Sequence, residues 1–256
     1  MARVARFNVT PVKSTLLHHP DEVHLATHGA TGDRRFFLVD ADGRRFSGAA
    51  KAPLLPIRAS YDPGHERLEL HLPDGRIVFG PATGDGEALT VDFYGRSVSA
   101  HVVGGGFAEA VSAFVGQPVR LVRPDREGEA LDVRPVTLVS LESVAELARQ
   151  GGREGALDAG RFRMTIEIEG AARPHEEDAW GGRHVRVGGA TLLVETPVPR
   201  CVVTTLDPET AVRDFPTLHV IRRYRGTLPT GKLPFGVYAS VVQPGTVKLG
   251  DPVEPV

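Results

Sequence analysis

Short runs in which apolar and polar residues alternate recur along most of this chain, and they constrain its fold most strongly. Turn signals such as ADG, PDG and VGG separate the runs. The 29 glycines and 20 prolines among 256 residues are spread along the sequence, which is typical of many short elements joined by turns. The runs predicted as strands are RFFLVD, RLELHL, RIVFG, LTVDFY, SVSAHVV, PVRLV, HVRVGGATLLVE, CVVTTLD, FGVYASVV and GTVKLG.

Two segments have the spacing of amphipathic helices. In GFAEAVSAFVG, residues 106–116, the apolar residues share one face and the last glycine is the predicted stop. In SLESVAELARQGG, residues 140–152, Ser140 or Ser143 is the predicted N-cap and two glycines end the helix. We therefore predict a mainly β (α+β) protein with few helices and with closed or barrel-like sheets.

The stretch RPDREGEALD, residues 123–132, is charged and poor in apolar residues. We interpret it as the connection between two β-rich halves, residues 1–122 and 123–256. No fixed repeat length relates the predicted strands to one another.

Composition excludes several classes of protein. The formal net charge of −2 argues against a nucleic-acid-binding domain, which usually carries a basic excess. A single cysteine excludes an internal disulfide framework, a Cys-rich zinc site and an all-Cys iron–sulfur cluster. The N-terminal MARVARFNVTPVKS reads as a first strand and lacks the apolar block of a secretory signal. No apolar stretch approaches roughly 18 residues. We expect a cytoplasmic protein without a membrane segment.

The only cysteine, Cys201, lies in TPVPRCVVTTLDP, residues 196–208. Pro197 and Pro199 fix φ on the approach and offer no backbone donor to a neighbouring strand. Arg200 beside the thiol favours the thiolate, the form that attacks or ligates a metal. Free cysteine is also among the most buried residue types, so a small core residue is the alternative. The framing nevertheless indicates a sulfur that points in one direction from a stiff scaffold.

Several basic residues stand at strand ends in a way that suits an anion. Lys13 and Ser14 in TPVKS close the first strand and combine an ammonium with a hydroxyl donor. Arg34 and Arg35 precede a hydrophobic strand, where adjacent side chains point to opposite faces, so at most one of them faces any one site. A solvated turn is the alternative for both pairs.

Two further elements suit an anion in the same way. The helix that begins near Ser140 offers unpaired N–H groups and a positive dipole end, although most helix starts bind only water. Arg161 and Arg163 in RFRMTIEI, residues 161–168, are predicted on one face of a strand.

Three other patterns predict no site. Histidines 18, 19, 24 and 28 lack the spacing of a zinc site. The acidic cluster in PHEEDAWG, residues 174–181, does not match a helical metal motif and reads as a solvated turn. The glycines at 104–106 do not complete G-x-G-x-x-G, because position 109 is a glutamate.

Taken together and in order, these stretches resemble proteins with a MOSC domain, named for the molybdenum cofactor sulfurase C-terminal region. The similar blocks run from about Asn8 to Val253, and the first half resembles the β-barrel domain that precedes MOSC in many members. The nearest in layout are the amidoxime-reducing components. The stretches that carry the resemblance are TPVKS, GDRRFFLVDADGR, GRFRMTIEI, HEEDAWGG, VPRCVVTTLDPET, LHVIRRYR, FGVYASVV and PGTVKLGDPV.

The resemblance implies a MOSC β-barrel packed against an N-terminal β-barrel-like domain, and a bound molybdenum cofactor (molybdopterin). It assigns the molybdenum ligand to Cys201. It implies reduction of an N-hydroxylated or N-oxygenated small molecule, with a separate ferredoxin-like or flavin electron donor, because one cysteine cannot hold an iron–sulfur cluster. The residues that it assigns to cofactor binding are Lys13, Ser14, Arg35 in preference to Arg34, Ser143, Arg163, Thr165 and Arg200.

Two departures from the family pattern leave other functions open. Met164 and Thr165 stand where Arg-Pro-Asn would place proline and asparagine. FSGAAKAP, residues 46–53, replaces a Thr-x-Arg-Gln stretch. The alternatives are a sulfurtransferase that carries a persulfide on Cys201 and a molybdopterin-binding protein without catalysis.

Overall fold

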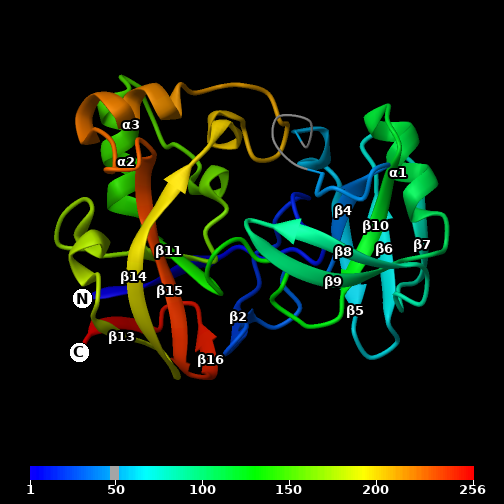
Figure 1. The fold of residues 1–256 in the computed structure, drawn as a ribbon. Helices are drawn as coiled ribbons and strands as arrows, with labels where there is room; N and C mark the ends of the chain where they lie inside the picture. Colours follow the sequence, from blue (N-terminus) through cyan, green and yellow to red (C-terminus); the bar gives the residue numbers. More distant parts are fainter. Residues whose placement is uncertain (47–51) are drawn as a thin grey trace.

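The computed structural model describes residues 1–46 and 52–256, and its largest element is a closed barrel. Seven strands form the barrel in the order β1-β12-β11-β15-β14-β13-β17 (Figure 1). Their bounds are β1 Ala2–Phe7, β11 Val136–Ser140, β12 Ile166–Glu169, β13 His184–Val187, β14 Ala190–Arg200, β15 Leu233–Gln243 and β17 Pro252–Pro255.

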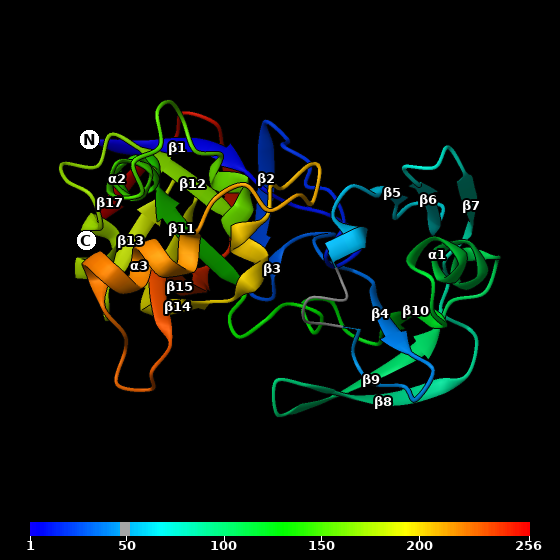
Figure 2. The same ribbon diagram turned by 90° about the horizontal axis from the view of Figure 1, so that it is seen from above.

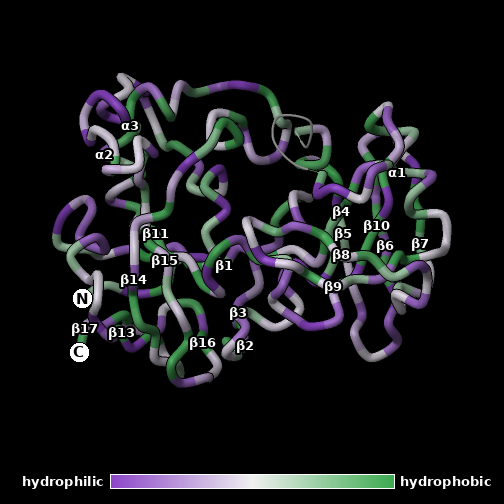
Figure 3. Tube along the Cα trace, in the orientation of Figure 1, coloured by the Kyte–Doolittle hydropathy of each residue, from purple (hydrophilic) through white to green (hydrophobic). Residues whose placement is uncertain are grey.

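Alternating apolar side chains fill the barrel. Val185 and Val187 of β13 are buried in its core, as are Leu192 and Val194 of the neighbouring β14. Figure 3 shows hydrophobic and hydrophilic residues mixed along these strands. The period-two pattern of the sequence is thus the pattern that a one-sided strand needs. The prediction of a mainly β protein with a barrel is confirmed.

Three further sheets complete the β structure. A four-stranded sheet has the order β4-β10-β9-β8, and two three-stranded sheets have the orders β5-β6-β7 and β16-β2-β3. Their bounds are β2 Glu22–Ala26, β3 Gly29–Ala30, β4 Phe37–Asp40, β5 Arg58–Asp62, β6 Arg67–His71, β7 Ile77–Pro81, β8 Ala88–Phe93, β9 Arg96–Val102, β10 Val119–Pro124 and β16 Gly245–Lys248.

The sheets of residues 37–124 form a second lobe beside the barrel (Figure 2). Side chains of β4 alternate between two cores: Leu38 packs against β5 and β6, whereas Phe37 and Val39 pack against β8 and β9. The segment that follows β10 leads back to the barrel.

Strands β1 and β2 do not lie with the rest of their half. β1 pairs with β12 and β17, and β2 pairs with β16 of the second half. The connection predicted at 123–132 therefore lies between the lobes, but the chain enters the barrel, leaves it for the second lobe, and returns. This path brings TPVKS to the junction of the lobes.

Three α-helices cover the sheets: α1 Phe107–Val115, α2 Leu141–Gln150 and α3 Thr217–Arg225. The first two match the predicted helices, with Gly116 as the left-handed C-cap of α1 and Ser140 as the N-cap of α2. The prediction of only two helices is wrong, because α3 was missed. Its buried Thr217, Val220 and Ile221 have helical spacing, and they pack beside the outer face of the barrel with α2.

Two predicted strands are wrong. CVVTTLD forms the short 3₁₀-helix η4, Val202–Thr205, because the Thr204 and Thr205 hydroxyls donate to carbonyls three residues back. RFRMTIEI begins with the 3₁₀-helix η2, Ala159–Phe162, and becomes a strand only at Ile166. A third 3₁₀-helix, η3, spans Glu176–Trp180.

Candidate functional site

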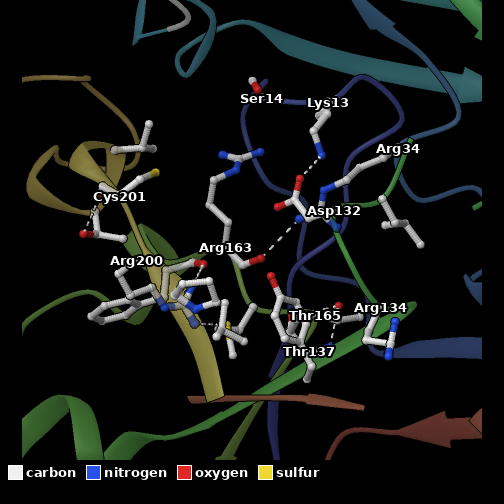
Figure 4. A pocket seen from close by; sticks show the side chains of 18 of the residues that line it. Lys13, Ser14, Arg34, Asp132, Arg134, Thr137, Arg163, Thr165, Arg200 and Cys201 are labelled. Carbon is white, nitrogen blue, oxygen red and sulfur yellow. Dashed lines mark hydrogen bonds and ion pairs between the residues drawn. The ribbon is translucent and has the colours of Figure 1, made fainter. Parts of the chain in front are cut away.

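A cavity that is partly open to solvent lies between the mouth of the barrel and the turn that follows β1 (Figure 4); its empty space, with the solvent at its opening included, is about 790 Å³. Segments far apart in the sequence line it: the turn after β1, the connection that leads into β11, the residues between η2 and β12, and the end of β14 with η4. Seven of the nine predicted site residues line this cavity, namely Lys13, Ser14, Arg34, Arg163, Thr165, Arg200 and Cys201.

Cys201 joins the end of β14 to η4 and is exposed. Its backbone is extended, and its carbonyl accepts hydrogen bonds from the Thr204 amide at 3.1 Å and hydroxyl at 2.9 Å. Figure 4 shows its sulfur directed into the cavity. The thiol is thus held on a tight turn at the cavity wall and is not a core residue.

A buried arginine fixes the far end of this turn. Arg161, 2% exposed, donates to both carboxylate oxygens of Asp214, at 3.0 and 2.9 Å, and to the Thr204 carbonyl at 3.2 Å. The Thr217 hydroxyl at the start of α3 donates to the same carbonyl at 2.6 Å. Bidentate arginine–carboxylate pairs define geometry as well as charge, so η4 has a fixed position.

Arg200 fixes the near end of the turn. Its guanidinium donates to the backbone carbonyls of Phe162, at 3.0 Å, and Phe235, at 2.8 Å. Burial lowers its pKa to about 10. These contacts join β14 to η2 and β15 beside Cys201. The Arg200 side chain therefore positions the cysteine, and its hydrogen bonds are made to protein groups.

Lys13, Ser14 and Arg34 form the opposite wall. Lys13 donates to the Ala130 carbonyl at 2.9 Å and to the Asp132 carboxylate at 2.6 Å. Arg34 is paired with Asp33 and donates to the Arg163 carbonyl at 3.1 Å.

The turn that carries Lys13 and Ser14 is tight. The Thr10 and Thr15 hydroxyls bond each other at 2.7 Å, and Ser14 has a φ of 76°. Lys13 and Ser14 are buried, yet both line the cavity.

Arg163 lies between the two walls. It caps η2 in a left-handed conformation, with φ 52°, so it does not share a strand face with Arg161 as predicted. One terminal nitrogen donates to the Thr15 carbonyl at 2.7 Å, while the other, Nη1, is buried and has no hydrogen-bond partner among residues 1–46 and 52–256. Burial, together with the charge of Arg34, lowers its pKa to about 9. A buried donor without a partner marks a place for an acceptor-bearing ligand.

Two predicted residues lie elsewhere. Arg35 lies between the turn at Arg34 and β4, donates to the Pro124 carbonyl at 2.6 Å and lines a separate hollow with Arg123. Of the two arginines, Arg34 lines the cavity with Cys201 and Arg35 does not, so the cavity does not favour the predicted preference for Arg35. Ser143 is fully buried in the first turn of α2, where its hydroxyl donates to Glu177 at 2.8 Å.

Comparison with known families agrees with this geometry. Residues 125–254 match the MOSC domain, and residues 1–118 match the MOSC N-terminal beta barrel domain. The chain belongs to the MOSC family. The mitochondrial amidoxime-reducing component 1 of Danio rerio is 29% identical over 88% of this chain and 75% of that protein. The component 1 of Mus musculus is 27% identical over 98% and 81%, and that of Homo sapiens 35% over 52% and 40%.

The cavity residues that were not predicted from the sequence of this MOSC protein include Asp132, Arg134, Thr137 and Tyr238. Asp132 is the last residue of the predicted connection and Arg134 lies just beyond it, where no local pattern marks a site. Tyr238 lies in the predicted strand FGVYASVV, and Thr137 lies in no predicted element. The substituted stretch at 46–53 lies largely outside the described residues, so its prediction stays untested.

The described residues hold no group of three or more histidine, cysteine or acidic side chains that suits a metal ion. Within the same residues no helix is long and apolar enough to cross a membrane.

Proposed function

We propose that this MOSC protein is a molybdenum-cofactor-dependent oxidoreductase that reduces N-oxygenated small molecules, with Cys201 as the molybdenum ligand. One observation carries the proposal: the only thiol of the chain faces the same cavity as a buried arginine nitrogen that has no hydrogen-bond partner in the part of the chain that the structure describes. The relatives named amidoxime-reducing components support the reaction class.

The cavity residues fit such a cofactor. Lys13, Ser14, Arg34 and Arg163 would hold its phosphate, because ammonium, hydroxyl and guanidinium groups bind phosphate through charge-assisted hydrogen bonds. Cys201 would supply a soft thiolate. Such a cofactor would supply the two-electron redox chemistry that removal of oxygen from the substrate as water requires.

The chain itself would place these groups and limit access to them. The bonds of Arg161 and Arg200 hold the Cys201 turn against η2, so the sulfur needs little reorganisation to bind the metal. The partly open cavity leaves room for a small substrate. A separate electron donor and a cytoplasmic location complete the proposal, whereas the similar amidoxime-reducing components are named mitochondrial.

Elemental analysis of gently purified protein, combined with Cys201→Ser, tests the proposal. We expect about one molybdenum per wild-type chain and reduction of N-hydroxylated bases with a chemical electron donor. Serine keeps the size of the side chain but loses the soft ligand, so turnover should fall by about a thousandfold or more. The unfolding temperature of the cofactor-free chain should not change, since the thiol is exposed.

Other outcomes identify the alternatives. Metal-free protein with full reductase activity contradicts the proposal. An increment of one sulfur atom on Cys201 that dithiothreitol removes, found by intact-mass spectrometry without bound molybdenum, indicates a sulfurtransferase. Tight pterin binding without reduction of any tested N-hydroxylated compound indicates a binding protein.

A further inference from the structure

Two threonines meet at one end of the barrel, on the floor of the cavity. Thr137 is the second residue of β11, and Thr165 directly precedes β12. These strands are parallel neighbours in which Leu138 pairs with Ile166, so the two threonines occupy the preceding register position. Both line the cavity, and Figure 4 shows them side by side below Arg163.

The hydrogen bonds between the two residues are reciprocal. The Thr165 amide donates to the Thr137 hydroxyl at 2.9 Å, and the Thr137 amide donates to the Thr165 hydroxyl at 3.3 Å. The two hydroxyl oxygens are 3.2 Å apart, so one hydroxyl donates to the other. Each hydroxyl oxygen therefore accepts a backbone N–H, and the pair has two protons to donate.

Only one of these two protons is used. Whichever hydroxyl donates within the pair, the proton of the other has no acceptor among the hydrogen bonds of the described residues. Thr165 is only 2% exposed and Thr137 is half-buried, so bulk water satisfies the proton poorly when it lies on Thr165. Two residues away in the sequence, the buried Nη1 of Arg163 is a further donor without a partner among the described residues.

We propose that the Thr137–Thr165 pair acts as one shared hydrogen-bond donor to an oxygen or nitrogen acceptor of the bound cofactor, in the place where the resembled family pattern has an asparagine. The assignment rests on the proposed function, because it needs a cofactor in the cavity. Since either hydroxyl can take either orientation, the donor belongs to the pair and not to one residue.

A double-mutant cycle on the full-length chain tests this assignment. Thr137→Val, Thr165→Val and the double variant are purified from a host that makes the cofactor. Pterin and molybdenum per chain are measured, and the rate of pterin loss after dilution is followed by fluorescence. Each single variant keeps one hydroxyl proton, so pterin loss should quicken by about threefold or less; the double variant keeps none, and loss should quicken by about tenfold or more.

Controls separate binding from folding. Each valine also removes the acceptor of one backbone N–H and the bond between the two hydroxyls, so the unfolding temperature of the cofactor-free chain should already fall in each single variant, whereas cofactor retention should fall sharply only in the double variant. The double serine variant keeps both hydroxyls and should retain cofactor like the wild type.

Three results would overturn the assignment. A double valine variant that holds cofactor as well as the wild type shows that the pair donates nothing to it. A Thr165→Val variant that loses pterin as fast as the double variant shows that the donor is Thr165 alone. A wild-type chain that carries no pterin overturns both this assignment and the proposed function, whereas the first two results leave the proposed function standing.

Discussion

The start of α2 and the cavity beside Cys201 both gather groups that bind anions, but they differ in what already binds them. At the start of α2, Glu177 accepts hydrogen bonds from the Ser140 amide at 3.2 Å, the Ser140 hydroxyl at 2.9 Å and the Ser143 hydroxyl at 2.8 Å. In the cavity, Nη1 of Arg163 is buried without a hydrogen-bond partner among the described residues. At the first place the carboxylate of Glu177 accepts from all of these donors. In the cavity Asp132 and Asp33 pair with Lys13 and Arg34, but neither accepts a hydrogen bond from this nitrogen of Arg163.

This difference shows that a pattern of donors is not by itself a binding site. A helix start with two serines attracts an anion, but here the fold supplies that anion from η3. Arg163 has the same kind of donors, and the fold leaves one of them unused at a cavity wall. Which donors remain for a ligand depends on the three-dimensional partners of each group.

The largest expected effect is at Arg163 in the cavity. Arg163→Met should lower the molybdenum and pterin content by about a hundredfold, because a charge-assisted hydrogen bond to the cofactor is lost. The free energy of unfolding of the cofactor-free chain should stay within about 1 kcal/mol of the wild type, since the variant removes a guanidinium that burial disfavours. Elemental analysis and urea unfolding measure the two quantities.

Arg35→Met is the matched control, because Arg35 is also buried and also donates to a carbonyl but lies outside the cavity. It should keep the cofactor. If both variants lose cofactor equally, or if Arg163→Met unfolds several degrees earlier without cofactor, Arg163 is a structural residue.

The second effect is the pH dependence of stability that His175 causes through its contacts with Tyr224 and Arg225. Nδ1 of His175 lies 3.1 Å from an Arg225 nitrogen that donates to it, and Nε2 lies 3.0 Å from the Tyr224 hydroxyl. Burial and the charge of Arg225 lower the pKa of His175 to about 4. The neutral ring therefore stabilises the fold fully above about pH 6.5, and this contribution is lost as the pH falls from 6.5 towards 4.

Urea unfolding at pH 6.5 and 4.5 tests this dependence against His175→Asn, in which asparagine tolerates the left-handed φ of 61°. The wild type should lose about 2 kcal/mol more than the variant between these pH values. Equal losses would show that the ring is not held neutral. Both proteins contain the same carboxylates, so subtracting the loss in the variant from the loss in the wild type removes the contribution of carboxylate titration.

Much of the fold could be predicted because its cause is local. Period-two runs became strands, and the glycine after α1 adopts the left-handed conformation that ends the helix. α3 had the helical spacing of Thr217, Val220 and Ile221, but β-branched residues and a basic face concealed it. CVVTTLD has high strand propensity, and the local threonine hydrogen bonds of η4 outweighed it.

The site was predictable only in part, for a different reason. Cys201 and Lys13 carry their chemistry in the sequence. The two arginines were predicted at the start of a strand, but Arg34 lies in the turn before β4 with a left-handed φ of 49°, which strand alternation could not predict. The roles of Asp132 and Thr137 arise from contacts with residues 119 and 28 positions away, Lys13 and Thr165, which no local pattern shows.

The smallest effect is expected at Glu177, which binds the start of α2. In Glu177→Gln the weaker hydrogen bonds from Ser140 and Ser143 reduce stability, but burial raises the pKa of Glu177, so glutamine also avoids the cost of a buried charge. These effects oppose each other, and the free energy of unfolding should change by about 1 kcal/mol or less, as judged against the exposed control Glu154→Gln. Cofactor content should equal that of the wild type. A loss of molybdenum in Glu177→Gln would contradict this prediction. It would indicate that Ser143, a hydrogen-bond partner of Glu177, contributes to cofactor binding.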